Sequence, residues 1–599
     1  MNEAPHIIDA LNARFVDVGF LKNDSLYISS IQTFDEGDYR GHTTTSYVAD
    51  LDGSAPRQLT LPGAEETSSR INLAVPATIV SVLPRDPRRV LVQGGRDGSF
   101  YLLDVKTLQS SKVLEGSDRF FGYQVDLSGT LRARLTADFD NGKVYIAQQI
   151  RNADTGAWEE HFRTYAKDRI DTSIFSFTSD PNVVLIATNK DSDKTGVYEY
   201  DLKQRKILEP AFEHKLFEAD GAMLSYAPGD FGQPLGFMYR AETDRAYWSD
   251  DYMRSVADQL TKALGEPAQS VDWTDPGSGA QAKISVATGA RVEIASMSDD
   301  KKVMVIKKSG PSYPPQFYLL TDGKTLAPIA KSRPWVDTTA LGDMQLVEYT
   351  ARDGLVIPAF LTTPPKAVFG PGPYPTLVEP HGGPWARDDM DWDDAGWVQY
   401  FASHGYAVLQ PQFRGSAGWG QKLWRAGDNE WGQKMSDDND DGVKWLIGQH
   451  IADPGRVAIF GYSYGGYAAL AAAIRPGGVY QCAISGAGVG DPKQVASYIY
   501  DDRYYREYQE PAVGGVDLLA HVADVKMPIL LYHGDRDQVV DIKNSREFAA
   551  KLKAAGKPYR YVEIPDMGHT DDTWTPAMAE QQLTEIDSFL KAGCKAGGL

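Results

Sequence analysis

The feature that most constrains the fold is a segment in which an apolar run is followed by a glycine-rich turn and an alanine-rich run. Residues 456–460 (RVAIF) predict a short buried strand, and residues 468–473 (AALAAA) predict a helix. The turn between them reads G-x-S-x-G around Ser463 and adds a further glycine, Gly466. Between a strand and a helix this motif is typical of a nucleophile elbow, which holds the serine in a strained backbone conformation. An ordinary glycine-rich turn is the alternative, and the flanking strand and helix favour catalysis.

Two later segments supply the partners that a serine nucleophile needs. A base must accept its proton, and an acid must orient that base, in the chain order Ser, Asp or Glu, His. Residues 528–533 predict a buried strand, and the turn after it carries Asp535 and Asp537. His569 lies on the loop after another predicted strand. We therefore predict a triad of Ser463, Asp537 and His569. Two other histidines are weaker candidates for the base: His521 and His533.

A third segment predicts an oxyanion hole. His381-Gly382-Gly383-Pro384 follows an apolar strand, and glycine there lets the backbone approach the reacting centre closely. Two preorganised N–H donors are needed for a tetrahedral intermediate. We assign them to Tyr464, directly after the nucleophile, and to Gly383, with its neighbour Gly382 as the alternative.

Six motifs occur in an order that resembles the prolyl oligopeptidase family of serine peptidases, and the branch most similar is the acylaminoacyl-peptidase-like one. In chain order they are HGGP (381–384), FRGSAGWG (413–420), WGQKMSDDNDDGVKWL (431–446), GYSYGGY (461–467), HGDRDQVV (533–540) and MGH (567–569). The resemblance covers residues 336–599. It implies an α/β-hydrolase domain preceded by a β-propeller that screens the site, and hydrolysis of short peptides, not folded proteins.

Two positions depart from the pattern of that family. Many exopeptidase-like members have Arg or Asn two residues after the catalytic Asp, where this chain has Val539. Dipeptidyl-peptidase members also carry a Glu-Glu pair that binds the free amino terminus. Glu65-Glu66 and Glu159-Glu160 are present, but neither has a helical context, and both read as solvated surface. Removal of dipeptides and release of acylated residues are therefore both in doubt.

The aromatic residues near the site bear on substrate preference. In the resembled family the region after residue 490 lines the primary pocket, which implies pocket roles for Tyr498, Tyr504 and Tyr505, with Trp385 beside the oxyanion loop. Ordinary helix packing of these tyrosines is an equal alternative. An apolar or aromatic residue before the scissile bond is our prediction.

The region from residue 20 to 335 reads as β-structure, because short alternating apolar stretches are separated by turn residues. A unit of strand, Asp-containing turn and strand recurs at spacings of about 40–55 residues or multiples of these, as in propeller blades. Its copies span Tyr47–Thr60, Tyr101–Leu114, Val197–Leu208 and Tyr318–Ile329. The length allows six or seven blades, and the resemblance favours seven. A generic β-sandwich is the alternative fold for this region. Residues 1–19 are predicted to form a lead segment before it.

One part of this region has helical periodicity. Residues 251–264 place apolar side chains on one helix face, and Gly265 and Pro267 end the helix. We expect a helix inserted in a blade connection that packs on its own blade.

The remaining residues, 336–599, read as an α/β-hydrolase domain. Val347–Pro365 predicts a hairpin around Asp353-Gly354, and strands then alternate with helices to the end. This alternation predicts a doubly wound, mainly parallel sheet covered on both faces.

The net charge and the acidic motifs indicate which partners and ligands this chain does not bind. The net charge of −20 is spread along the chain, which argues against nucleic acid and anionic membrane. Residues 437–442 (DDNDDG) resemble half of a calcium loop, but the twelfth position is Gly448, not Glu, so we expect the start of a helix. The acidic run 387–394 reads as a solvated loop. We predict no metal and no cofactor.

The two cysteines, Cys482 and Cys594, predict no disulfide framework. With no signal peptide and no membrane-spanning run in the given chain, we predict a cytoplasmic protein, or a periplasmic or secreted one if the chain is a trimmed mature form. A homo-oligomer is possible on this sequence. An esterase of the same fold, an isopeptidase and a non-catalytic propeller module are the other function classes.

Overall fold

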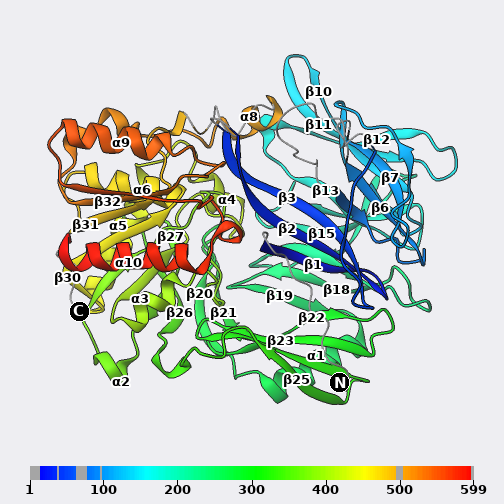
Figure 1. Cartoon of the computed structure of the whole chain (residues 1–599), viewed down its shortest axis with the longest axis horizontal. Helices are drawn as coiled ribbons and strands as arrows, with labels where there is room; N and C mark the ends of the chain where they lie inside the picture. The colour runs from blue at the N-terminus through cyan, green and yellow to red at the C-terminus, as the bar shows by residue number, and fades with distance from the viewer. Residues whose placement is uncertain are drawn as a thin grey trace.

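A computed structural model describes residues 14–36, 39–62, 77–94, 98–493, 495 and 503–594. Figure 1 shows two parts side by side: small antiparallel sheets arranged as a β-propeller, and one large sheet flanked by helices. The predicted division at residues 335/336 falls between the last propeller strand, β25 (Thr325–Lys331), and the first strand of the large sheet, β26 (Asp343–Thr350).

The described propeller strands form seven antiparallel sheets, five of four strands, one of three and one of two. The first two sheets are β1 (Arg14–Lys22), β2 (Ser25–Glu36), β3 (Tyr39–Asp50), β4 (Arg57–Gln58), and β5 (Thr78–Ser81), β6 (Arg89–Gly94), β7 (Ser99–Asp104), β8 (Ser110–Leu114). The next two are β9 (Phe120–Val125), β10 (Leu131–Asp140), β11 (Lys143–Arg151), β12 (Trp158–Tyr165), and β13 (Thr172–Phe177), β14 (Val183–Thr188), β15 (Gly196–Asp201), β16 (Lys206–Phe212). The last three are β17 (Glu218–Leu224), β18 (Pro234–Arg240), β19 (Asp244–Trp248), then β20 (Gln269–Thr274), β21 (Gln281–Val286), and β22 (Arg291–Met297), β23 (Val303–Gly310), β24 (Tyr313–Thr321), β25.

The two sheets with fewer than four strands flank helix α1 (Asp251–Leu264). The Asp250 side chain caps this helix by accepting from the Met253 N–H. Its buried face, Met253, Val256 and Leu260, joins an apolar cluster with strands of the propeller. The predicted inserted helix therefore packs on the propeller, as expected.

The large sheet has eight strands in the order β26-β27-β29-β28-β30-β31-β32-β33. The first two form the predicted hairpin, and the strands from β29 to β33 are parallel. Their bounds are β27 (Val356–Thr363), β28 (Tyr374–Val378), β29 (Ala407–Pro411), β30 (Ala452–Tyr462), β31 (Cys482–Gly486), β32 (Ile529–Gly534) and β33 (Tyr559–Ile564). Because parallel strands share one carboxyl edge, the loops after β28, β30, β32 and β33 meet there.

Helices cover both faces of this sheet, with α10 crossing in front of it in Figure 1 and α5 and α6 behind. Their bounds are α2 (Lys366–Phe369), α3 (Trp397–Ser403), α4 (Gln421–Arg425), α5 (Lys434–Gly448), α6 (Tyr464–Ile474), α8 (Arg503–Gln509), α9 (Lys543–Ala554) and α10 (Pro576–Ala592). None of the helices in the described ranges has a stretch long and apolar enough to cross a membrane.

The apolar core of the large sheet continues into the propeller. Trp273 of β20 is 2% exposed and packs against Trp419, with ring centroids 5.4 Å apart. Phe217 and Val286 belong to the same buried cluster. The two parts are therefore joined by a buried apolar contact as well as by polar ones.

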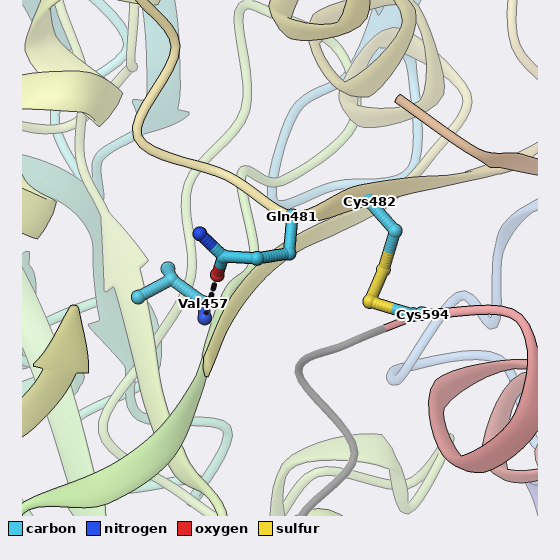
Figure 2. The surroundings of a disulfide bond; sticks show 4 residues. All are labelled: Val457, Gln481, Cys482 and Cys594. Carbon is cyan, nitrogen blue, oxygen red and sulfur yellow. Dashed lines mark hydrogen bonds between the residues drawn. A yellow bond between two sulfur atoms is a disulfide. The ribbon is translucent and has the colours of Figure 1, made fainter. Parts of the chain in front are cut away.

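One expectation is wrong: the two cysteines form a disulfide. Cys482 at the start of β31 is bonded to Cys594, just after α10, with their Cα atoms 5.4 Å apart (Figure 2). The two cysteines are separated by 112 positions in the sequence, so no local pattern indicated the pairing. It depends on α10 returning along the sheet, which only the tertiary fold shows. The disulfide fastens the end of α10 to a central strand.

Candidate active site

Ser463 lies at the sharp turn between β30 and α6, with φ 59° and ψ −120°. This is a backbone conformation that residues other than glycine rarely adopt. A Cβ on Gly465 would overlap the Pro380 carbonyl oxygen, and one on Gly461 would overlap the backbone of Gly465. The glycines of the motif are therefore required by close packing around the serine, as the sequence suggested.

Asp537 and His569 meet on the loops after β32 and β33. Asp537 Oδ2 is 2.6 Å from His569 Nδ1, while Oδ1 accepts the N–H groups of Val539 and Val540 at 2.9 and 2.8 Å. The Asp537 side chain is fully buried. Burial by itself would raise its pKa, but hydrogen bonds from two histidines, His533 and His569, hold the pKa well below its usual value.

Asp535, the alternative acid, lies elsewhere in the same turn. Its Oδ1 accepts the Asp566 N–H at 2.6 Å, and its Oδ2 is 3.3 Å from Arg40. The structure thus brings Asp537, and not Asp535, to His569.

His533 is the residue that sequence reasoning undervalued. It is fully buried, and its Nε2 lies 2.9 Å from the Val540 carbonyl oxygen and 3.2 Å from Asp537 Oδ2. Its Nδ1 lies 2.8 Å from the Ser545 hydroxyl. A single Nε2–H shared between Val540 and Asp537 satisfies this geometry. Both ring nitrogens of His533 are therefore engaged, one of them near Asp537, which leaves His569 as the candidate base. The H-G-x-x-D spacing was the available signal for this contact.

His569 lies close to the turn that carries Ser463. Its ring centroid is 5.2 Å from that of Tyr462, the residue before Ser463. No hydrogen bond joins the Ser463 hydroxyl to His569 among the described residues. Catalytic hydrogen bonds are often long without substrate.

The predicted oxyanion loop follows β28 and faces the serine. A Cβ built on Gly382 would lie 3.5 Å from Ser463 Cβ and 4.0 Å from its Oγ. Gly383 is exposed and has φ 112°, a conformation that favours glycine. Tyr464 is the first residue of α6, so its N–H is one of the unpaired donors of a helix N-terminus. Both predicted donors therefore belong to segments next to Ser463.

His381 holds this loop from behind. Its ring stacks on Phe413, its Nδ1 lies 2.7 Å from the Gly382 carbonyl oxygen, and its Nε2 lies 2.7 Å from the Ser416 hydroxyl. Burial lowers its pKa to about 4, so the ring is neutral at pH 7. In a trans peptide unit the N–H points opposite the C=O. Holding the Gly382 carbonyl therefore fixes the direction of the Gly383 N–H.

The predicted pocket residues have varied positions. Trp385 is partly buried and contacts Trp431, with ring centroids 6.1 Å apart. Tyr504 is buried against Val144 and Ala166 of the propeller, so it contributes to the contact between the two parts. Tyr498 and the side chain of Tyr505 lie outside the described residues.

The first propeller sheet reaches the loops that carry Asp537 and His569. Arg536, only 6% exposed, donates to Asp35 Oδ2 at 2.8 Å, to the Phe34 carbonyl at 2.6 Å and to Asp566 at 2.6 Å. The His42 N–H donates to Gln538 at 3.0 Å. These contacts connect the β2–β3 hairpin to residues that flank Asp537 and His569.

The two acidic runs are structural. Residues 437–441 lie inside α5, which begins earlier than predicted, and buried Asp438 pairs with Arg414 at 2.7 Å. The run 387–394 is not a solvated loop, because Met390 is fully buried and Asp393 accepts the N–H groups of Ala395 and Val398 at the start of α3. The Met390 N–H donates to the Glu242 carbonyl and Asp391 pairs with Arg291, so its burial follows from packing on the propeller.

A mainly parallel eight-stranded sheet with a nucleophile elbow, preceded by a propeller, defines the class of propeller-covered α/β-hydrolases. Residues 392–596 match the prolyl oligopeptidase family. This match covers the carboxyl-terminal part of the chain, and together with the peptidase relatives it identifies a serine peptidase. Dipeptidyl aminopeptidase BIII of Pseudoxanthomonas mexicana is 25% identical over 82% of this chain and 70% of its own length. The acylamino-acid-releasing enzyme of Sus scrofa is 25% identical over 62% of this chain and 52% of its own length.

Solved structures have the same fold over nearly the whole chain. A puromycin-hydrolyzing peptidase of Mycobacterium tuberculosis aligns with a TM-score of 0.65 at 15% identity, covering 97% of this chain and 94% of that one. An acylaminoacyl peptidase bound to a chloromethyl ketone aligns with a TM-score of 0.57 at 15% identity, covering 98% of this chain and 97% of that one. Identity at this level shows the fold alone.

Proposed function

We propose that the chain hydrolyses short peptides through Ser463, His569 and Asp537. The observation that carries the proposal is the 2.6 Å contact between Asp537 and His569, beside the strained turn of Ser463. The loops after three separate strands bring Ser463, Asp537 and His569 to one place. A purely structural protein has no need of this combination of side chains.

The chemistry follows from the positions of these groups. His569 Nε2 takes the proton of the Ser463 hydroxyl as Oγ attacks the peptide carbonyl carbon. The N–H groups of Tyr464 and Gly383 stabilise the oxyanion that forms. The C–N bond then breaks, His569 gives its proton to the departing amine, and water hydrolyses the acyl-enzyme by the same route.

We infer that the propeller selects substrates by size. The β2–β3 hairpin contacts the loops of Asp537 and His569, so the propeller lies over the edge of the sheet where catalysis would occur. An extended segment is needed for attack, and a folded protein would have to unfold to supply one, at roughly 1–2 kcal/mol for each ordered residue. Short flexible peptides avoid this cost.

A second candidate is an exopeptidase that counts from the amino terminus, favoured by the names of the relatives. Val539 is 52% exposed and offers no polar clamp for the substrate backbone. Glu159 is paired with Arg205, and Glu160 with Arg163. Glu65-Glu66 lies outside the described residues. These observations favour an endopeptidase over an exopeptidase that binds the free amino terminus.

The disulfide bears on the compartment. Disulfides persist in oxidising environments and are rare in the cytosol. The Cys482–Cys594 bond therefore favours a periplasmic or secreted protein over the cytoplasmic one expected from the sequence.

The test combines active-site labelling with a digest. A fluorophosphonate should label the wild type and fail to label Ser463→Ala; labelling of the variant would remove Ser463 as nucleophile. A flexible peptide of about ten residues, its N-acetylated form and a folded protein containing the same segment are then compared. Cleavage of both peptides but not the folded protein is expected. Dependence on a free amino terminus would establish the exopeptidase instead.

A further inference from the structure

A cavity of about 150 Å³, whose lining includes several polar side chains, lies behind the predicted oxyanion loop and near Ser463. Glu379, Gln410 and Tyr462 line it together with Gly382 and Trp397. At roughly 30 Å³ for each water in the liquid, it has room for about five waters or for the charged end of one long side chain. It is too small for a whole large residue with its backbone.

Three side chains that line this cavity carry buried polar atoms without a partner. Glu379 and Gln410 are each 7% exposed, and Tyr462 is 9% exposed. Within the described residues, Glu379 Oε2, Gln410 Oε1 and the Tyr462 hydroxyl have no hydrogen-bond partner. An unsatisfied buried polar group costs about 1–3 kcal/mol, so three around one cavity indicate a ligand or waters that satisfy them.

The charge of the cavity selects the ligand. Asp388 and Asp393 also line it, and no Lys or Arg is among the described lining residues. Burial, together with these two carboxylates, raises the pKa of Glu379 well above its usual value. A cation with several N–H donors would offset the repulsion between these three carboxyl groups and would donate to the acceptor atoms that lack a partner. The carboxylates of the described residues do not converge as metal ligands would, which favours an organic cation.

One lining residue, Tyr462, connects the cavity to His569, the proposed base. His569 would protonate the departing amine, so that part of the substrate must lie beside its ring. Tyr462 contacts the His569 ring and also lines the cavity. Tyr464, on the other side of Ser463, packs instead against Trp431 and Phe413.

We propose that this cavity binds the ammonium or guanidinium group of a lysine or arginine that follows the scissile bond. The proposal rests on the proposed roles of Ser463 and His569. It gives the enzyme a preference for basic residues on the departing side, set chiefly by Glu379, with Gln410 and Tyr462 as hydrogen-bonding partners.

The experiment first locates a cleaved bond with a synthetic peptide mixture read by mass spectrometry. One cleaved peptide is then made with Lys, Arg, norleucine or Glu after that bond, and kcat/KM is measured for each. Norleucine matches the length of the lysine stem without its charge. We expect Lys and Arg to exceed norleucine by at least about tenfold and Glu to be poorest.

Glu379→Gln should reduce the Lys-to-norleucine ratio to within about twofold of unity, and Asp388→Asn should reduce it less. The matched control is Glu547→Gln, an exposed glutamate on α9, which should keep the wild-type ratio. Because the readout is a ratio within each variant, a general loss of activity does not imitate the effect.

Two results overturn the proposal, and they are distinguishable. Wild-type cleavage with equal kcat/KM for Lys and norleucine shows that the cavity holds only water, while the peptidase function stands. Absence of any cleavage together with absence of Ser463 labelling removes the proposed function and the subsite with it. A basic preference that persists in Glu379→Gln, in a variant with wild-type circular dichroism, also contradicts the assignment.

Discussion

Replacing Asp537 by asparagine should disable catalysis through the tautomer of His569. Asp537 Oδ1 accepts two N–H groups, from Val539 and Val540, so the amide of an asparagine must keep its oxygen there. Its NH₂ group then takes the place of Oδ2 and faces His569 Nδ1, at the position now 2.6 Å away. An NH₂ donor requires Nδ1 to be the acceptor, which leaves the proton on Nε2. The nitrogen that should accept the Ser463 proton is then already protonated.

The size of the effect follows from this geometry. Because the backbone donors fix the orientation of the amide, the wrong tautomer cannot be relieved by a simple flip. In the well-studied Ser-His-Asp triad of a serine protease, the same exchange of aspartate for asparagine lowers kcat by about 10⁴, and we take our magnitude from that case. A factor of 10⁴ corresponds to about 5.5 kcal/mol in activation free energy. Ground-state binding should change little, since the carboxylate lies behind His569.

The assay is kcat and KM on one cleaved peptide, with fluorophosphonate labelling rate as a second readout. Asp535→Asn is the matched control, because Asp535 lies in the same turn and contacts Asp566 and Arg40, not His569. It should lose less than about tenfold. A loss below tenfold for Asp537→Asn, or a larger loss for Asp535→Asn, would refute the reasoning.

Four other predictions follow from single contacts. Arg536→Met should lower kcat by about 10- to 100-fold, because Arg536 holds the loops of Asp537 and His569 against the propeller. Arg546→Met removes an ion pair with Glu563 away from the propeller and should leave kcat unchanged. Equal kcat values for the two variants would show that Arg536 does not hold these loops in place. Cys594→Ser should lower the free energy of unfolding by roughly 3–5 kcal/mol in urea, and an unchanged midpoint would count against it. Gly465→Ala should abolish labelling of the active serine, since the added methyl overlaps a carbonyl oxygen. Burial lowers the pKa of His381 to about 4, below the value of about 6.5 in an unfolded chain. The unfolded chain therefore binds a proton at a higher pH than the folded chain, and stability is lost as the pH falls from about 6.5 toward 4. The urea midpoint should fall across that window, and it should fall less steeply in His381→Gln.

The strand–turn–helix unit around Ser463 could be predicted from the sequence because local rules govern it. A strand that leads through G-x-S-x-G into a helix has few ways to fold, and the glycines around Ser463 are required by contacts over short distances. The insertion helix α1 was predicted for the same reason, since its apolar face and cap are local. The resemblance to the prolyl oligopeptidase family follows from motifs of this kind.

The start of α5 shows where local reading fell short. The acidic run 437–442 is predicted to start a helix, but the helix begins earlier, at Lys434, and the run lies inside it. Arg352, Arg414 and Arg475 from distant segments neutralise its carboxylates. Propensity cannot include partners that arrive only on folding. The same holds for the run 387–394, whose burial depends on the propeller.

What the sequence by itself determined is the set of chemical groups and the order of the strands that carry them. The tertiary structure decided which groups meet: Asp537 with His569, His533 with Asp537, Cys482 with Cys594, and Arg536 with the first propeller sheet. Each of these pairs except the second joins segments from 32 to 501 residues apart. Contacts across such separations depend on how strands and helices pack in three dimensions, which a local pattern of residues does not encode.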